Sequence, residues 1–190
     1  MSNASPLGAR IQVMGMTCSG KSTLAERLGA ILDLPYTDLD ALFWLPGWVG
    51  RADDDWHPTL RNLAEGERWV VSGNYFRHTS ANLWPRVQTI VWLDLPLRVL
   101  LPRIFMRSWR RSRRKELLWG TNTEVFWRQL KLWDPDVSLF AYALRGRKRQ
   151  DARLLAAMSD PAFAHIRFIR LRSPAEIEAF VQAIERAVHG

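Results

Sequence analysis

Apolar residues along the chain form two kinds of pattern: short continuous runs, and longer stretches in which they recur every three or four positions. The short runs predict five buried strands, at 10–15, 35–38, 68–72, 88–95 and 165–171. The recurring pattern predicts helices at 21–32, 53–65, 97–115, 123–133 and from 174 onward. Strands that alternate with helices favour an α/β fold with a five-stranded parallel sheet and helices on both of its faces.

Length and composition fit one globular domain spanning residues 1–190. The chain has 190 residues, 47% of them hydrophobic, which is enough for a sizeable core. We expect residues 1–8 to be a disordered tag remnant. The chain has a single cysteine and no apolar run of about 18 residues, which together predict a cytoplasmic protein without a membrane span.

The positive charge of the chain is concentrated in one internal block. The formal net charge is +8, and residues 101–153 alone carry +9, from 14 basic and 5 acidic residues. A block of this kind indicates an anionic partner. Nucleotide phosphates, nucleic acid and a phosphorylated metabolite all fit that description.

A glycine-rich motif follows the first predicted strand and precedes the first predicted helix. Gly15, Gly20, Lys21 and Ser22 match the pattern G-x-x-x-x-G-K-S, whose backbone N–H groups surround phosphate oxygens. Lys21 is expected to reach the β- and γ-phosphates of ATP, and the Ser22 hydroxyl to bind Mg²⁺. The residues expected to bind the nucleotide here are Gly15, Thr17, Ser19, Gly20, Lys21, Ser22 and Thr23.

Two carboxylates, Asp38 and Asp40, come at the end of the second predicted strand. Residues two apart on an extended strand point the same way, and strand carboxyl ends are where ligands bind in such sheets. We therefore expect Asp38 to serve the metal and Asp40 to orient an acceptor hydroxyl for attack. A helix cap and a turn residue are the structural alternative. The four histidines, at 57, 78, 165 and 189, show no metal-binding spacing.

Four segments together resemble P-loop kinases of the adenylate kinase-like group, and most closely the proteins labelled DNA topology modulation protein. They read GMTCSGKST at 15–23, TDLDALFWLPGW at 37–48, WVVSGNY at 69–75 and TIVWLDLPLRVLLPRIFMRSWRR at 89–111. With the last strand and helix, the resemblance covers nearly the whole chain. It implies a three-layer P-loop fold in which about 101–150 form an arginine-rich helical lid.

The resemblance also implies roles for individual residues. Arg103 and Arg107 follow Asp94 in the spacing of lid arginines, which close over ATP. Gly73 and Arg77 lie where the group contacts the acceptor, and the adenine loop falls at Arg172. Relatives carry an aspartate near Mg²⁺ where this chain has Ser72, so either Asp38 supplies that charge or the activity is weak. Trp44 either walls a pocket for a flat acceptor or packs as an ordinary aromatic residue.

These observations favour an ATP- and Mg²⁺-dependent phosphotransferase acting on a small nucleotide- or nucleoside-like molecule. Its expected catalytic residues are Lys21, Asp38, Asp40, Arg103 and Arg107. Asp40, Trp44, Gly73 and Arg77 are the expected acceptor residues. Two alternatives stay open: a nucleic-acid-associated NTPase that uses the 101–153 block, and a nucleotide sensor without an acceptor.

Overall fold

A computed structural model describes residues 6–114, 117–120, 122–123 and 138–189. The helix predicted at 123–133 lies outside these residues, except for its first position. Part of the predicted lid, at about 101–150, is outside them as well. Among the described residues, no helix has the length and apolar character needed to cross a membrane.

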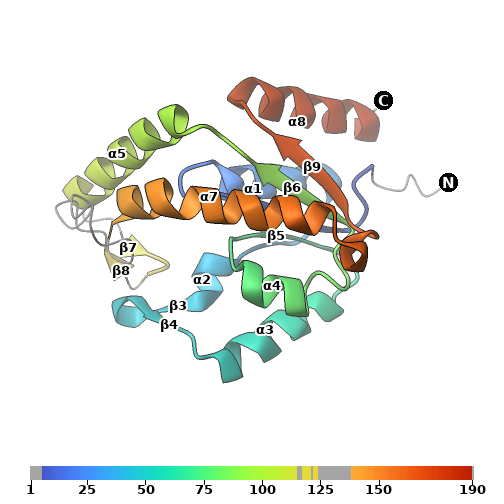
Figure 1. Ribbon diagram of the computed structural model, residues 1–190, viewed down its shortest axis with the longest axis horizontal. Coiled ribbons are helices and arrows are strands. Elements are labelled where there is room, and N and C mark those ends of the chain that lie inside the picture. The colour runs from blue at the N-terminus through green and yellow to red at the C-terminus, as the bar shows by residue number, and fades with distance from the viewer. Residues whose placement is uncertain (1–5, 115–116, 121, 124–137, 190) are drawn as a thin grey trace.

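Five parallel strands form the central sheet, as predicted (Figure 1), and their spatial order is β2–β5–β1–β6–β9. The strands are β1 (Arg10–Gly15), β2 (Tyr36–Asp38), β5 (Trp69–Ser72), β6 (Thr89–Leu93) and β9 (Arg167–Leu171). In this register Val13 lies opposite Ser72 on one side and Val91 on the other. All five carboxyl ends therefore meet at one edge of the sheet, where ligands bind in folds of this class.

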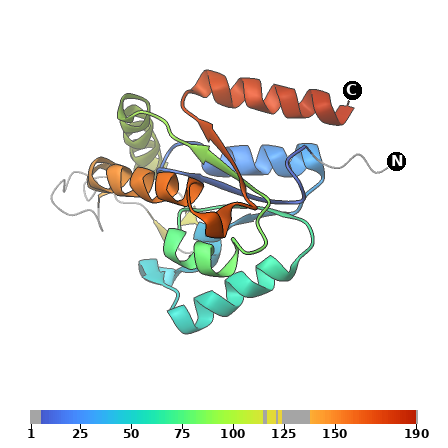
Figure 2. The ribbon, with the colours of Figure 1, turned by 45° about the vertical axis from the view of Figure 1, so that its right-hand side comes forward.

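Helices cover both faces of this sheet because successive strand side chains point to opposite sides. Ile11 and Val13 pack in one core cluster with helices α1 (Lys21–Leu32) and α8 (Pro174–His189). Met14 and Trp92 belong to a second cluster on the opposite face. Figure 2 shows α1 and α8 on one side of the sheet. The helices of the second face are α3 (Asp53–Glu65), α4 (Phe76–Asn82) and α7 (Leu139–Met158).

The remaining elements lie around the carboxyl edge of the sheet. Helix α5 (Leu97–Arg114) packs on α7 through a third apolar cluster that includes Leu100, Ile104 and Ala143. The short elements are α2 (Leu39–Phe43), β3 (Trp44–Leu45), η1 (Pro46–Trp48), β4 (Val49–Gly50), β7 (Leu117–Leu118), β8 (Asn122–Thr123) and η2 (Pro161–Phe163). The predicted helix over 97–115 thus corresponds to α5.

The structure differs from expectation at two places. Residues 6–8 are packed against the sheet, because Leu7 is buried and its carbonyl accepts a hydrogen bond from the Thr89 hydroxyl at 2.6 Å. Helix α7 runs past residue 150 to Met158, and its Leu154 and Ala157 belong to the sheet core. The second half of α7 is therefore part of the folded domain.

Candidate active site

The loop between β1 and α1 has the conformation that its glycines permit. Gly20 has φ of 94° and ψ of 15°, a left-handed conformation that a side chain would strain. At Gly15 a Cβ would lie 2.6 Å from Ser19 Oγ and 2.9 Å from Leu93 Cβ, so no larger residue fits between the loop and β6. Gly20 is thus required by its backbone conformation, and Gly15 by the lack of space for a side chain.

The amino end of α1 offers backbone donors to an anion. Gly20 caps α1 without any side-chain hydrogen bond, and no acidic residue lies in the first turn. The first N–H groups of a helix have no partner inside it, and its dipole attracts negative charge. Ser19 Oγ is buried without a hydrogen-bond partner among the described residues. The backbone N–H groups at the start of α1 and the Ser19 hydroxyl can therefore donate hydrogen bonds to the phosphate groups of a nucleotide.

Asp38 and Asp40 are brought together, but the predicted strand geometry is wrong. β2 ends at Asp38, which caps α2 by accepting a hydrogen bond from the Asp40 N–H at 3.0 Å. Asp40 lies in the first turn of α2, so the two carboxylates do not extend from one strand. Asp40 still faces the end of the loop, because its Oδ2 lies 3.6 Å from Lys21 Nζ. The cap predicted as the structural alternative is therefore present alongside the site geometry.

Three hydroxyl groups and a carboxylate form an oxygen cluster beside the start of α1. Ser72 Oγ lies 3.3 Å from Ser22 Oγ and 3.4 Å from Asp38 Oδ1. Tyr36 Oη lies 3.0 Å from the same Ser72 oxygen. Hard oxygen donors of this kind suit Mg²⁺. Ser22 and Asp38 would thus hold a magnesium ion, and Ser72 lies beside both of them.

Charge and burial set the protonation of two site groups. Burial raises the pKa of the Asp38 carboxyl, and the negative charge of Asp40 raises this pKa further. Burial also raises the pKa of the Tyr75 hydroxyl far above its ordinary value, so that the hydroxyl keeps its proton. Tyr75 donates this proton in a 2.8 Å hydrogen bond to Asp40 Oδ1. Asp40 is thus held between a hydroxyl and an ammonium group.

Arg103 and Arg107 reach from α5 to the glycine-rich loop. Arg103 donates to the Ser19 carbonyl at 3.4 Å, and Arg107 donates to Thr17 Oγ1 at 2.9 Å. The Nε of Arg107 is buried without a partner among the described residues. A cavity of about 310 Å³ separates α5 from the loop, and it is lined by Cys18, Gly20, Lys21, Ser22, Thr23, Arg103, Arg107, Arg110 and Arg111.

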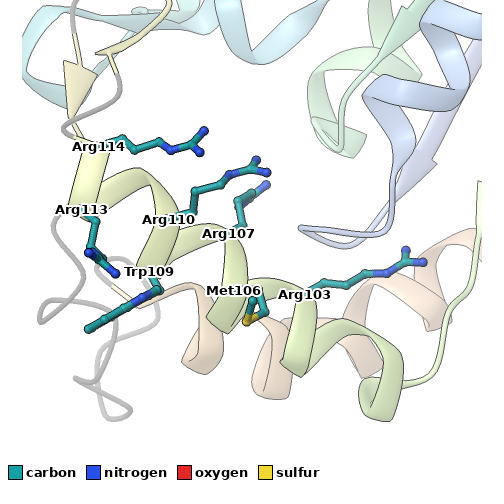
Figure 3. A pocket seen from close by; sticks show the side chains of 7 residues that line it. All are labelled: Arg103, Met106, Arg107, Trp109, Arg110, Arg113 and Arg114. Carbon is teal, nitrogen blue, oxygen red and sulfur yellow. The ribbon is translucent and has the colours of Figure 1, made fainter.

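A larger hollow of about 680 Å³ continues this cavity along α5. Figure 3 shows the side chains of Arg107, Arg110 and Arg114 extending in the same direction from the helix. Intervals of three and four residues place them on one face. The full lining is Arg103, Met106, Arg107, Trp109, Arg110, Arg113 and Arg114. We call the face with Arg103, Arg107, Arg110 and Arg114 the arginine stripe of α5.

The structure gives Trp44 and Gly73 packing contacts. The Trp44 ring meets the Phe43 ring edge to face at 5.0 Å and the Trp48 ring at 5.7 Å. Gly73 is buried, and a Cβ there would lie 2.8 Å from Leu39 Cβ. Gly73 thus lets α2 approach the end of β5. Their predicted roles in acceptor binding stay predictions.

Arg77 and Arg172 are not brought to the cavity. The Arg77 side chain is exposed on α4, and its positive charge acts on His78. Arg172 is exposed at the end of β9, where its N–H donates to Glu176 Oε2 at 2.9 Å. Because that N–H is engaged, any contact between an adenine and Arg172 is left to its carbonyl oxygen or its side chain.

Asn74, at the carboxyl end of β5, is a site residue to which the sequence analysis gave no role. Its Oδ1 accepts from the Gly15 N–H at 3.0 Å, and its Nδ2 donates to the Gly15 carbonyl. Gln150 of α7 contacts both ends of the same amide. The position of Asn74 just after the buried strand β5 was the one feature of the sequence that indicated a role at the site. Asn74 therefore ties β5 and α7 to the start of the glycine-rich loop.

We predict that Asn74→Ala lowers the free energy of unfolding by about 1–3 kcal/mol, because both backbone groups of Gly15 lose their partner. Asn74→Asp should lower it further, since a carboxylate oxygen would then face the Gly15 carbonyl. Urea denaturation measures both effects. Asn62→Ala, at an exposed position of α3, is the control. Wild-type stability in Asn74→Asp would contradict the prediction.

A buried ion-pair group at the ends of β6 and β9 was also missed. Asp94, 6% exposed in its side chain, accepts from Arg147 at 3.0 Å and from Arg170 at 2.7 Å. The Arg170 guanidinium also lies over the Trp92 ring, 4.4 Å from its centroid. Two arginines around one carboxylate leave no uncompensated negative charge. Asp94 thereby connects α7 to the sheet edge that carries the site.

No protein-family model matches this sequence, and no curated protein matches it. Solved structures of kinases do. The chain is similar to a sugar kinase from Janibacter, with a TM-score of 0.51 and 18% identity, over 96% of this chain and 99% of that one. It is also similar to a gluconokinase from Sinorhizobium meliloti, with a TM-score of 0.51 and 19% identity, over 97% and 93% of the two chains.

A shikimate kinase from Aquifex aeolicus is similar as well, with a TM-score of 0.51 and 18% identity, over 95% of this chain and 99% of that one. At such low identity these similarities show the fold alone. They confirm the predicted fold class, while the resemblance to adenylate kinase-like and DNA topology modulation proteins stays a prediction. The chain shares the α/β fold of these kinase structures, with a five-stranded parallel sheet and helices on both faces.

Proposed function

We propose that this protein is an ATP- and Mg²⁺-dependent phosphotransferase that acts on a hydroxyl group of a small molecule. The observation that carries the proposal is a cavity lined by a lysine, a serine of the oxygen cluster and two arginines, with a carboxylate beside the lysine. Lys21, Ser22, Arg103 and Arg107 line that cavity, and Asp40 lies 3.6 Å from the Lys21 ammonium. The kinase names of the structural neighbours support the same class of reaction.

In this proposal, the acceptor oxygen forms a bond to the γ-phosphorus while the bond to the β–γ bridging oxygen breaks and ADP leaves. Asp40 accepts the hydroxyl proton of the acceptor. Lys21, Arg103 and Arg107 balance the negative charge of the phosphates, and α5 excludes water. Ser22 and Asp38 would hold Mg²⁺, which neutralises phosphate charge when bound. We further propose a nucleotide- or nucleoside-like acceptor and a cytoplasmic location.

The arginine stripe of α5 favours a second candidate function, an NTPase that binds nucleic acid. Its residues 103–114 span about 16 Å of helix, and its guanidinium groups suit successive phosphates of a strand. This candidate predicts DNA or RNA binding that weakens steeply as salt increases. Ser72, in place of a metal-binding carboxylate, is the feature that would fit a nucleotide sensor without an acceptor.

ADP release from Mg²⁺-ATP, measured across a panel of nucleotides, nucleosides and hydroxyl-bearing metabolites, tests the proposal. Stimulation by one acceptor class, absent in Lys21→Ala, is the expected result and identifies the acceptor. A flat panel in a protein that binds ATP tightly would contradict phosphotransfer to these acceptors. Salt-sensitive nucleic-acid binding would then favour the NTPase, and its absence would favour the sensor.

A further inference from the structure

The α3–α4 helix pair carries a group of side chains that the proposed function does not use. Asp53 and His57 are four residues apart in α3 and thus share one face of that helix. His78 belongs to α4, which packs against α3. One ligand atom of each of these three residues lies within 4.8 Å of the other two. The histidine spacing gave no metal signal because the fold brings the two rings together from separate helices.

The ring of His78 has an unmet hydrogen-bonding capacity. Its Nδ1 is buried and has no hydrogen-bond partner among the described residues. Asp53 Oδ1 is 3.8 Å from this nitrogen, too far for a hydrogen bond. The His57 ring lies 5.3 Å away, centroid to centroid. Because a buried polar atom without a partner is costly, a cation between these groups would relieve that cost.

The ring of His57 is already oriented by a neighbouring amide. Asn82 Nδ2 lies 2.7 Å from His57 Nδ1, which leaves Nε2 as the nitrogen available to a cation. The same amide bonds the His78 carbonyl at 2.8 Å, so it connects the two histidines. Coordination through Nε2 places the ring proton on Nδ1, so the amide must turn its oxygen to accept that proton and exchanges its bond to the His78 carbonyl for this one. Asn82 is thus a positioning residue for this group.

We propose that Asp53, His57 and His78 form a binding site for a divalent transition-metal ion, with Zn²⁺ as the best-suited ion. Two imidazoles and a carboxylate are a zinc donor set and leave one position for water. Bonds of about 2.0–2.2 Å require the donors to approach by roughly 1 Å. The Asp53 side chain, 57% exposed at the start of α3, can make that movement and gives the ion a route in from solvent.

The expected consequence is that the ion fastens α3 to α4. Helix α4 follows Asn74 and Tyr75 directly in the chain. Asn74 holds the start of the glycine-rich loop, and Tyr75 donates to Asp40. A metal on α4 would therefore stabilise the wall that carries these contacts, and it does so whatever acceptor the active site takes. Arg77, whose charge also acts on His78, opposes the cation and weakens the site.

Calorimetric titration of the untagged, nucleotide-free protein with Zn²⁺ tests this site. We expect one ion per chain, with the dissociation constant raised about 10–100-fold or more in His57→Gln and in His78→Gln. Asp54→Asn is the matched control, because Asp54 is an exposed neighbour in the same first turn of α3. Zn²⁺ should raise the melting temperature of the wild type and of this control, but not of the histidine variants.

Two results would overturn the proposal. One is wild-type protein that binds no Zn²⁺. The other is unchanged Zn²⁺ affinity in both histidine variants, which would place the ion elsewhere, for example at Cys18. If a histidine variant fails to fold, Asp53→Asn still decides the question, because it removes an exposed ligand. These measurements need no ATP, so their outcome is independent of the proposed phosphotransfer.

Discussion

Replacing Lys21 with alanine is expected to lower the turnover of Mg²⁺-ATP by about 10²–10³-fold, the usual cost of removing one preorganised donor from a developing charge. The Lys21 side chain is 13% exposed and lies at the start of α1, beside the cavity under α5. No other lysine lines that cavity among the described residues. Lys21 is therefore the lysine whose ammonium group can balance the charge of the transferring phosphoryl group.

Steady-state kinetics with the acceptor found in the panel measures this effect. Lys148→Ala is the matched control, because Lys148 is exposed on α7 and lines neither cavity. Lys21→Arg should also lose activity, since a planar guanidinium does not fit where a compact ammonium group fits. Turnover in Lys21→Ala equal to that of Lys148→Ala would show that the observed ATP hydrolysis arises at another site.

The features that were predicted correctly depend on neighbours in the sequence. The glycine-rich loop is one, because Gly20 at φ 94° and the helix from Lys21 follow from local conformational rules. The five strands are another, since the run from Thr89 to Leu93 is buried throughout. Sequence patterns report such local requirements directly.

The Asp38 error shows how a short local motif can override a periodic rule. Alternation along a strand predicts that Asp38 and Asp40 point the same way, but a five-residue helix begins between them. The Asp38 carboxylate caps that helix, which competes with continuation of the strand. Helix α2 is too short to leave a periodic signal, so only the helix-cap alternative at the aspartate pair indicated it.

The parts that could not be predicted depend on contacts between distant residues. Asn74 bonds Gly15, 59 positions earlier, and Gln150, 76 positions later. Nothing in the local sequence around Asn74 encodes these distances. The meeting of His57 with His78 has the same origin, because it follows from the packing of α3 on α4.

Asp40→Asn is expected to lower turnover by about 10²–10⁴-fold while leaving ATP binding nearly unchanged. Asparagine keeps the size of the side chain and still accepts the Tyr75 hydrogen bond, so the change removes the negative charge and the proton acceptor. Tyr75→Phe should have a smaller effect, because it removes only one hydrogen bond from a carboxylate that Lys21 still faces.

The comparison of Asp40→Asn with Asp38→Asn separates acceptor activation from metal binding. Asp38 shares its oxygen cluster with Ser72 and Ser22, so its substitution should raise the Mg²⁺ concentration needed for half-maximal activity, and excess Mg²⁺ should restore much of the rate. Excess Mg²⁺ should not restore Asp40→Asn, because a missing proton acceptor is not replaced by a metal on the other carboxylate. If excess Mg²⁺ instead restored Asp40→Asn and not Asp38→Asn, Asp40 would be the metal ligand, and Asp38 would be the residue that accepts the proton of the acceptor hydroxyl.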